Sequence, residues 1–64
     1  MEISRQAAKR VLKKAGAKRV SDGAASEFAE TVEKFAYTVA SKAVKLAKHA
    51  KRATIKREDV ELAC

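Results

Sequence analysis

The fold of this chain depends mainly on residues 21–50, which read SDGAASEFAETVEKFAYTVASKAVKLAKHA. Ser21 is a suitable N-cap, and Asp22 adds a negative charge to the first turn, where the helix dipole favours it. Apolar residues then recur with the spacing of one helix face, at positions 25, 28, 29, 32, 35, 36, 39, 40, 43, 46, 47 and 50. No proline interrupts this pattern, so the sequence predicts one long helix that continues to residue 50.

The length of this helix predicts a dimer. A helix of this span is about 45 Å long, whereas a compact chain of this size has a diameter of roughly 30 Å. The shorter segments on either side cannot cover both ends of the apolar face. We therefore expect a second chain to pack against it, and a homodimer also supplies the core that 64 residues lack. The alternative is a marginally stable helical hairpin.

A first, shorter helix is predicted before this stretch. Ser4 is its N-cap, and Ile3 is placed to pack against Ala8 as a hydrophobic staple. Apolar residues follow at positions 7, 8, 11, 12 and 15. Gly16 suits the left-handed position just beyond a helix end. The sequence therefore predicts a helix between Ser4 and Gly16.

A third, short helix is predicted from Lys56. Two acidic residues, Glu58 and Asp59, fall in its first turn, where they oppose the helix dipole favourably. Its expected buried face comprises Val60, Leu62 and Ala63. The connection over residues 51–55 contains β-branched threonine and isoleucine, so we expect it to be extended.

The charge of the chain is concentrated in its first third. Fifteen Lys and Arg against eight Asp and Glu give a net charge of +7. Residues 1–20 contain seven basic residues and one acidic residue, residues 21–50 are neutral, and residues 51–64 carry +1. Clustered cations favour an anionic polymer as partner, because binding releases its condensed counterions. The alternative is a basic surface that only keeps the protein soluble.

Several other classes of protein are disfavoured. A single cysteine cannot form an internal disulfide, which suggests a reducing compartment, and no apolar run is long enough to span a membrane. His49 and Cys64 do not make a metal site by themselves, and no nucleophile motif accompanies the histidine. We therefore expect no catalytic residue, no metal, no cofactor and no small-molecule substrate.

Two stretches resemble the archaeal histones: AGAKRVSDGA at 15–24 and ASKAVKLAKHAKRATIKREDVELA at 40–63. The resemblance implies a single all-α histone-fold domain over residues 1–64, with a short, a long and a short helix, paired as a handshake homodimer. It further implies an architectural chromatin protein that bends, wraps and compacts double-stranded DNA without sequence specificity. Its partners are DNA and itself or a paralogous histone, and its location is the chromosome in the cytoplasm.

The resemblance assigns DNA binding to five residues: Arg10, Lys13, Arg19, Thr54 and Lys56. Arg10 and Lys13 match phosphate contacts on the first helix, and Arg19 matches an arginine that enters the minor groove. Thr54 matches a loop threonine beside the partner's groove-entering arginine, and Lys56 a basic residue near the DNA backbone. A guanidinium suits a narrow, negative minor groove, whereas lysine and threonine bind phosphates. The alternative for each basic residue is an ordinary solvated charge.

Other matching positions imply structural roles. Arg52 and Asp59 match a salt bridge that braces the second connection against the last helix. A contact between stacked dimers is implied for Leu46, His49, Asp59 and Leu62, and Gly16 matches the point where turns of a superhelix approach each other. For His49 the alternative is a merely exposed histidine.

The chain also departs from the family pattern. It has no proline in residues 1–6, has Ala53 where a second basic residue commonly follows Arg52, and stops at Cys64. We therefore expect a shorter last helix and weaker stacking. Phe28 and Phe35 are expected in the core rather than as a platform for stacking bases, and Tyr37 at the surface.

Two other functions stay open on the sequence. The chain could be a histone-fold dimerisation subunit of a transcription or repair complex, with a different histone-fold chain as partner. A basic amphipathic helix on anionic membranes is disfavoured, because the apolar face is mostly alanine and lacks tryptophan.

Overall fold

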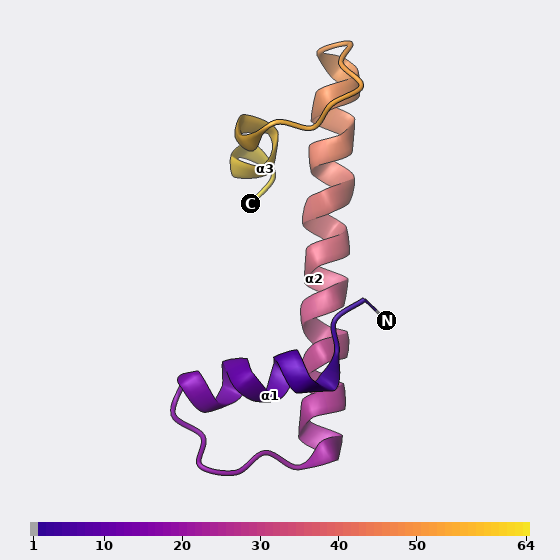
Figure 1. Cartoon of the computed structure of the whole chain (residues 1–64). Helices are drawn as coiled ribbons and strands as arrows, with labels where there is room; N and C mark the ends of the chain where they lie inside the picture. Colours follow the sequence, from indigo (N-terminus) through magenta and orange to yellow (C-terminus); the bar gives the residue numbers. More distant parts are fainter. Residues whose placement is uncertain (1) are drawn as a thin grey trace. The chain divides into compact units, whose positions relative to one another are not determined.

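The computed structural model describes residues 2–64 (Figure 1). Over these residues the chain forms three helices: α1 (Arg5–Lys14), α2 (Asp22–His49) and α3 (Arg57–Ala63). The predicted all-α fold with a short, a long and a short helix is confirmed. The chain divides into two compact units, one ending at Lys34 and the other comprising Phe35–Cys64. The 28-residue helix α2 contributes to both units.

Serine caps begin the first two helices, as the sequence predicts. The Ser4 hydroxyl accepts a hydrogen bond from the Ala7 amide at 3.1 Å, and the Ser21 hydroxyl accepts one from the Ala24 amide at 3.0 Å. Each cap satisfies one of the amide groups that have no partner within the first turn of a helix.

Both α1 and α2 end in the same hydrogen-bonded turn. The amide of Gly16 donates to the carbonyl of Lys13, and the amide of Ala17 donates to that of Leu12. This pairing requires a positive φ at the residue after the C-cap Ala15, and Gly16 at that position has a φ of 121°. The end of α2 repeats the turn with Lys51, whose φ is 59°, in the glycine position. The extended conformation predicted over residues 51–55 is wrong at Lys51, because this residue is left-handed and turns the chain.

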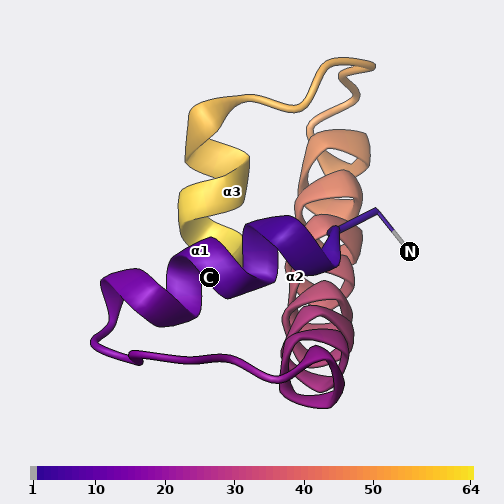
Figure 2. The same ribbon diagram turned by 60° about the horizontal axis from the view of Figure 1, so that its bottom comes forward.

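The first unit packs α1 across the beginning of α2 (Figures 1 and 2). Its core consists of Ala8, Ala25 and Ala29, and three larger side chains pack partly buried against it: Ile3, Val20 and Phe28. The small alanine side chains let the two helices approach closely. Ile3, predicted to pack against Ala8, packs against the alanine cluster that contains Ala8.

The second unit places α3 beside the last part of α2 (Figures 1 and 2). Ala63 is buried, as predicted. The burial predicted for Val60 and Leu62 is wrong in the single chain, because 42% of Val60 and 74% of Leu62 is exposed. Asp59 is buried instead, since an arginine pairs with its carboxylate.

Neither unit buries a large apolar side chain fully. Among residues 2–64 the buried apolar residues are all alanine, and no large side chain has less than 2% exposure. Phe28 is partly buried, but Phe35 is 67% exposed, so the prediction that both phenylalanines lie in the core fails for Phe35 within one chain. Tyr37 is exposed, as predicted. Within residues 2–64 the single chain thus leaves seven large apolar side chains exposed.

Candidate nucleic-acid interface

One face of α1 carries cations without acidic partners. Arg10, Lys13 and Lys14 lie on the side of the helix away from the buried Ala8, because at roughly 100° per residue they fall about 120–160° around the helix axis from it. All three side chains are exposed, and within the described residues none forms an ion pair. Like charges three and four residues apart destabilise a helix by roughly 0.2–0.5 kcal/mol per pair. An anionic partner would reduce the repulsion between these cations.

Lys9 is the exception in this basic segment. Its ammonium group lies 2.8 Å from a carboxylate oxygen of Asp22, the first residue of α2. The hydrogen bond and charge of Lys9 lower the pKa of Asp22. Because 13 positions separate the two residues, no helical spacing in the sequence indicates this pair. Lys9 therefore links α1 to the start of α2, and its charge is already partly neutralised.

A second carboxylate also acts within the first unit. Glu33 on α2 accepts hydrogen bonds from the backbone amides of Ile3 and Glu2. Both hydrogen bonds lower the pKa of Glu33, and the one from the Ile3 amide has the larger effect. The entry into α1 is thereby attached to α2, a role that the sequence did not indicate.

The first connection presents Arg19 between two anchored points. Gly16 ends α1 in the turn described above, and Val20 packs against the alanine core of the first unit. Lys18 and Arg19 lie between them, are exposed and form no ion pair within residues 2–64. The structure thus places Arg10, Lys13 and Arg19 in one unit, on α1 and the connection that follows it.

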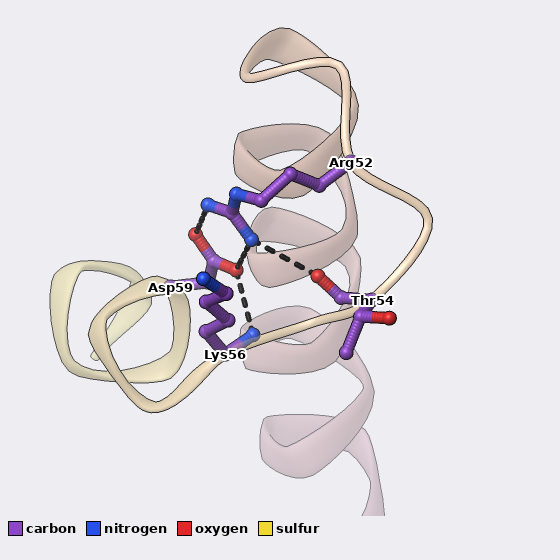
Figure 3. Close-up of polar contacts among 4 residues, drawn as sticks. All are labelled: Arg52, Thr54, Lys56 and Asp59. Carbon is purple, nitrogen blue, oxygen red and sulfur yellow. Dashed lines mark hydrogen bonds and ion pairs between the residues drawn. The ribbon is translucent and has the colours of Figure 1, made fainter.

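The second connection is braced by one arginine (Figure 3). The guanidinium nitrogens of Arg52 donate to both carboxylate oxygens of Asp59, each at 2.8 Å. One of these nitrogens also donates to the backbone carbonyl of Thr54 at 2.9 Å. The predicted ion pair between Arg52 and Asp59 is therefore present. It is bidentate, a geometry that fixes the relative orientation of the two side chains.

Asp59 also caps the start of α3. Its carboxylate accepts a hydrogen bond from the backbone amide of Lys56, the N-cap of α3, at 2.8 Å. The Arg52 guanidinium and the Lys56 amide together lower the pKa of Asp59 to about 2. Because both carboxylate oxygens are engaged and the side chain is 4% exposed, Asp59 is not an available surface group in the single chain.

This bracing leaves the neighbouring polar groups free to face outward. The hydroxyl of Thr54 points away from the ion pair (Figure 3), and Thr54 and Lys56 are both exposed. These two expected DNA-binding residues lie in the second unit, whereas the other three lie in the first. Neither unit alone contains all five expected DNA-binding residues.

The residues expected at a contact between dimers are partly brought together. Leu46, His49 and Leu62 line one open pocket in the second unit. Asp59 does not line it. Gly16 is exposed, and a side chain there would meet no atom within 4 Å.

The described residues offer no site of another chemical class. Within residues 2–64, no three His, Cys, Asp or Glu side chains are grouped so that they could hold a metal ion. Cys64 is a free, exposed thiol. No helix in this part of the chain is long and apolar enough to cross a membrane.

A long helix between two short ones, with cations concentrated on the first helix and its connection, defines a small basic protein with the histone fold. The chain belongs to the family of histone-like transcription factors (CBF/NF-Y) and archaeal histones, which it matches over residues 1–64. The family is one of DNA-binding chromatin proteins that pair through the histone fold, and not one of enzymes.

Two curated relatives support this membership. The chain is 59% identical over 54 residues to a "Probable archaeal histone 3" of Methanocaldococcus jannaschii, across 84% of this chain and 81% of the relative. It is 52% identical over 54 residues to one subunit of the archaeal histone HAN1 of Thermococcus zilligii, with the same coverage of both chains. The resemblance to archaeal histones is therefore confirmed.

Proposed function

We propose that residues 1–64 form a single histone-fold domain in a handshake homodimer, which binds, bends and compacts double-stranded DNA without reading base sequence. The observation that carries this proposal is the unpaired basic surface of α1 and the first connection, on a chain of the histone family. We place this protein on the chromosome in the cytoplasm, without a cofactor. A paralogous histone could replace the second copy.

The pairing of two chains is supported by the apolar side chains that one chain leaves exposed. They include Val11 on α1, Phe35 and Val44 on α2, Ile55 before α3 and Val60 on α3. Each fully buried alanine of one chain contributes about one methyl group to the core, worth about 0.8 kcal/mol. A second copy that covers these larger side chains would supply the missing core, so that folding and pairing would occur together.

DNA contact is supported by the two connections. In a handshake dimer the first connection of one chain lies beside the second connection of the other, which would place Arg19 near the partner's Thr54. The exposed hydroxyl of Thr54 and the exposed amine of Lys56 would bind phosphates, while Arg19 would enter the minor groove. Arg10 and Lys13 would continue the path along α1.

We further propose that dimers stack through Leu46, His49 and Leu62. Asp59 would act in this contact by holding α3 in place through Arg52, because its own carboxylate is buried. Gly16, with open space around its backbone, would allow a neighbouring turn of the assembly to approach.

Homodimerisation is tested with two aromatic residues that lie on different faces of α2. Phe35 continues the apolar face of Phe28, whereas Tyr37 points about half a turn away, and both are mostly exposed in one chain. Sedimentation of the Phe35→Ser variant should show a dimer dissociation constant raised by about a hundredfold or more, since two phenylalanines leave the interface. Tyr37→Ser is the matched control and should remain dimeric. Equal dimers from both variants would refute the proposed interface.

The alternative function is a dimerisation subunit with a different histone-fold partner, which the transcription factors in the matched family favour. Solution mass separates the two functions. A stable dimer of the purified chain supports a homodimeric histone, whereas a monomer or aggregate that a second chain rescues supports the subunit. Nuclease digestion of complexes with DNA then tests stacking, because stacked dimers protect a regular ladder of fragments and isolated dimers protect a single short one.

A further inference from the structure

The contact between α1 and α2 in the first unit is made mainly by alanine (Figure 2). Ala8 of α1 is buried in one cluster with Ala25 and Ala29 of α2. An alanine side chain ends at its Cβ atom, so it brings two helices close together but makes few contacts that resist rotation of one helix about the other. Three larger side chains around this cluster are only partly buried: Ile3, Val20 and Phe28. The alanine contact therefore fixes the distance between the helices more firmly than the direction of α1.

Two carboxylates of α2 lie on either side of this contact along the helix. Asp22 precedes Ala25, and Glu33 follows Ala29. Asp22 and Glu33 are about three helical turns apart, which is about 17 Å of rise, and they share one flank of α2 because this spacing is close to a whole number of turns. Bonds at these two positions can therefore resist rotation of α1 about the alanine contact.

Both carboxylates are bonded to the first segment of the chain. Oε1 of Glu33 accepts hydrogen bonds from the backbone amides of Glu2 and Ile3, the second at 3.0 Å, just before α1 begins. The carboxylate of Asp22 lies 2.8 Å from the ammonium group of Lys9, near the middle of α1. One attachment thus holds the entry to α1, and the other holds its middle.

The attachment through Glu33 is the stronger of the two. The Asp22 side chain is 74% exposed, so solvent screens its ion pair, and Lys9 reaches it over a flexible four-carbon chain. Glu33 is half-buried, and its donors are backbone amides, which lose no side-chain freedom on bonding. Hydrogen bonds to a charged acceptor are also roughly twice as strong as those between neutral groups. Glu33 therefore determines the direction of α1 more than Lys9 does.

We propose that Glu33 is a positioning residue for DNA: it holds the entry to α1 and so fixes where the cations of α1 lie relative to Arg19. This inference rests on the proposed function, in which Arg10 and Lys13 of α1 contact DNA together with Arg19. Attraction to the duplex depends mainly on how many phosphates the protein neutralises, whereas bending requires contacts at fixed separations along the backbone. Glu33 should therefore control how far DNA bends, with little effect on the salt dependence of binding.

Three variants of α2 isolate this role. Glu33→Ala removes the acceptor, whereas Glu33→Gln keeps Oε1, the atom that accepts both hydrogen bonds. Glu27→Ala is the matched control, because Glu27 is exposed on the same helix and forms no ion pair within residues 2–64. Each variant makes every chain more positive by one charge, so the long-range attraction of DNA rises equally.

A fourth variant tests reach without a change of charge. Glu33→Asp shortens the side chain and withdraws the carboxylate from the amides of Glu2 and Ile3. It should behave as Glu33→Ala does, and it replaces that variant if the alanine substitution prevents folding. Circular dichroism and sedimentation check that the helix content and solution mass of each variant stay those of the parent.

The direction of α1 is measured first, in the absence of DNA. Residual dipolar couplings of the backbone amides report how α1 is oriented relative to α2 in solution. In Glu33→Ala the couplings of α1 should no longer fit the orientation found in the parent, while those of α2 should still fit. Glu33→Gln and Glu27→Ala should keep the parent orientation. Unchanged couplings of α1 in Glu33→Ala would overturn the inference.

Bending is measured next, by fluorescence energy transfer between the ends of a duplex. Glu33→Ala should lose bending relative to Glu27→Ala, while the slope of log K against log salt stays equal for these two variants. Glu33→Gln should bend DNA as the control does, because it keeps the acceptor atom. A contact that only stabilises the fold would instead lower the unfolding midpoint of Glu33→Ala and leave the bend in its folded complex unchanged.

That last result would overturn the inference, and so would two others. Equal loss of bending in Glu27→Ala would show that charge, and not the attachment of α1, sets the bend. Loss of bending in Glu33→Gln would exclude the acceptor atom as the cause. A parent protein that binds DNA without bending it would refute the proposed function itself, and Glu33 would then have only the structural role that the couplings measure independently.

Discussion

Arg19→Ala tests whether a single residue of the first connection makes a DNA contact of its own. Arg19 is exposed and has no ion pair within residues 2–64, so its charge is available to a phosphate. A dimer has two copies, and each neutralised phosphate contributes about −0.9 to the slope of log K against log salt. The variant should therefore bind with a slope smaller by about 1.8.

This slope predicts a loss of affinity that depends on salt. If only counterion release is lost, affinity should fall by about 60-fold at 0.1 M salt and by about 20-fold at 0.2 M. Anisotropy titrations of a labelled duplex over this range measure both quantities. Fluorescence energy transfer between the duplex ends should also show less bending, because the minor groove loses its guanidinium.

Two matched variants separate charge from geometry. Arg19→Lys keeps the charge and should preserve the salt slope, but it should bend DNA less, because a compact hydrated ammonium fits the narrow groove poorly. Lys9→Ala removes a cation that Asp22 partly neutralises, and its slope should change less than that of Arg19→Ala. If Arg19→Ala bends DNA and responds to salt as the parent does, the contact assigned to Arg19 is wrong.

Three further predictions concern stability. Ser4→Ala removes the cap of α1 and should lower the free energy of unfolding by about 1 kcal/mol in a urea titration; an unchanged midpoint would show that the cap contributes nothing. Lys51→Gly should raise the free energy of unfolding by about 0.5–1 kcal/mol, because glycine adopts the positive φ of this turn without strain, while Gly16→Ala should lower it; opposite signs in thermal melts would contradict the turn. Since the pKa of Asp59 falls from its ordinary value near 3.8 to about 2, its contribution to stability is complete above about pH 5 and is lost as the pH falls from about 4 to 2. Asp59→Asn should therefore flatten the acid limb of stability measured by circular dichroism, and a limb as steep as that of the parent would exclude this carboxylate as its cause.

Local chemistry explains why the helices were predictable. The caps at Ser4 and Ser21 and the turn at Gly16 depend on neighbouring residues, so the sequence shows them directly. The long apolar repeat of α2 likewise has a period that only a helix matches. The Arg52 and Asp59 pair came instead from a family resemblance, because an ion pair between a connection and a helix has no characteristic spacing.

The sequence by itself determined the helical class of this protein and the position of its basic segment, and it predicted a partner chain, because these follow from periodicity, charge and length. Only the tertiary structure decided which cations are available. It pairs Lys9 with Asp22 and leaves Arg10 and Arg19 exposed. It also buries Asp59 rather than Leu62, because packing and ion pairing depend on side chains that meet from distant positions, which no sequence spacing encodes.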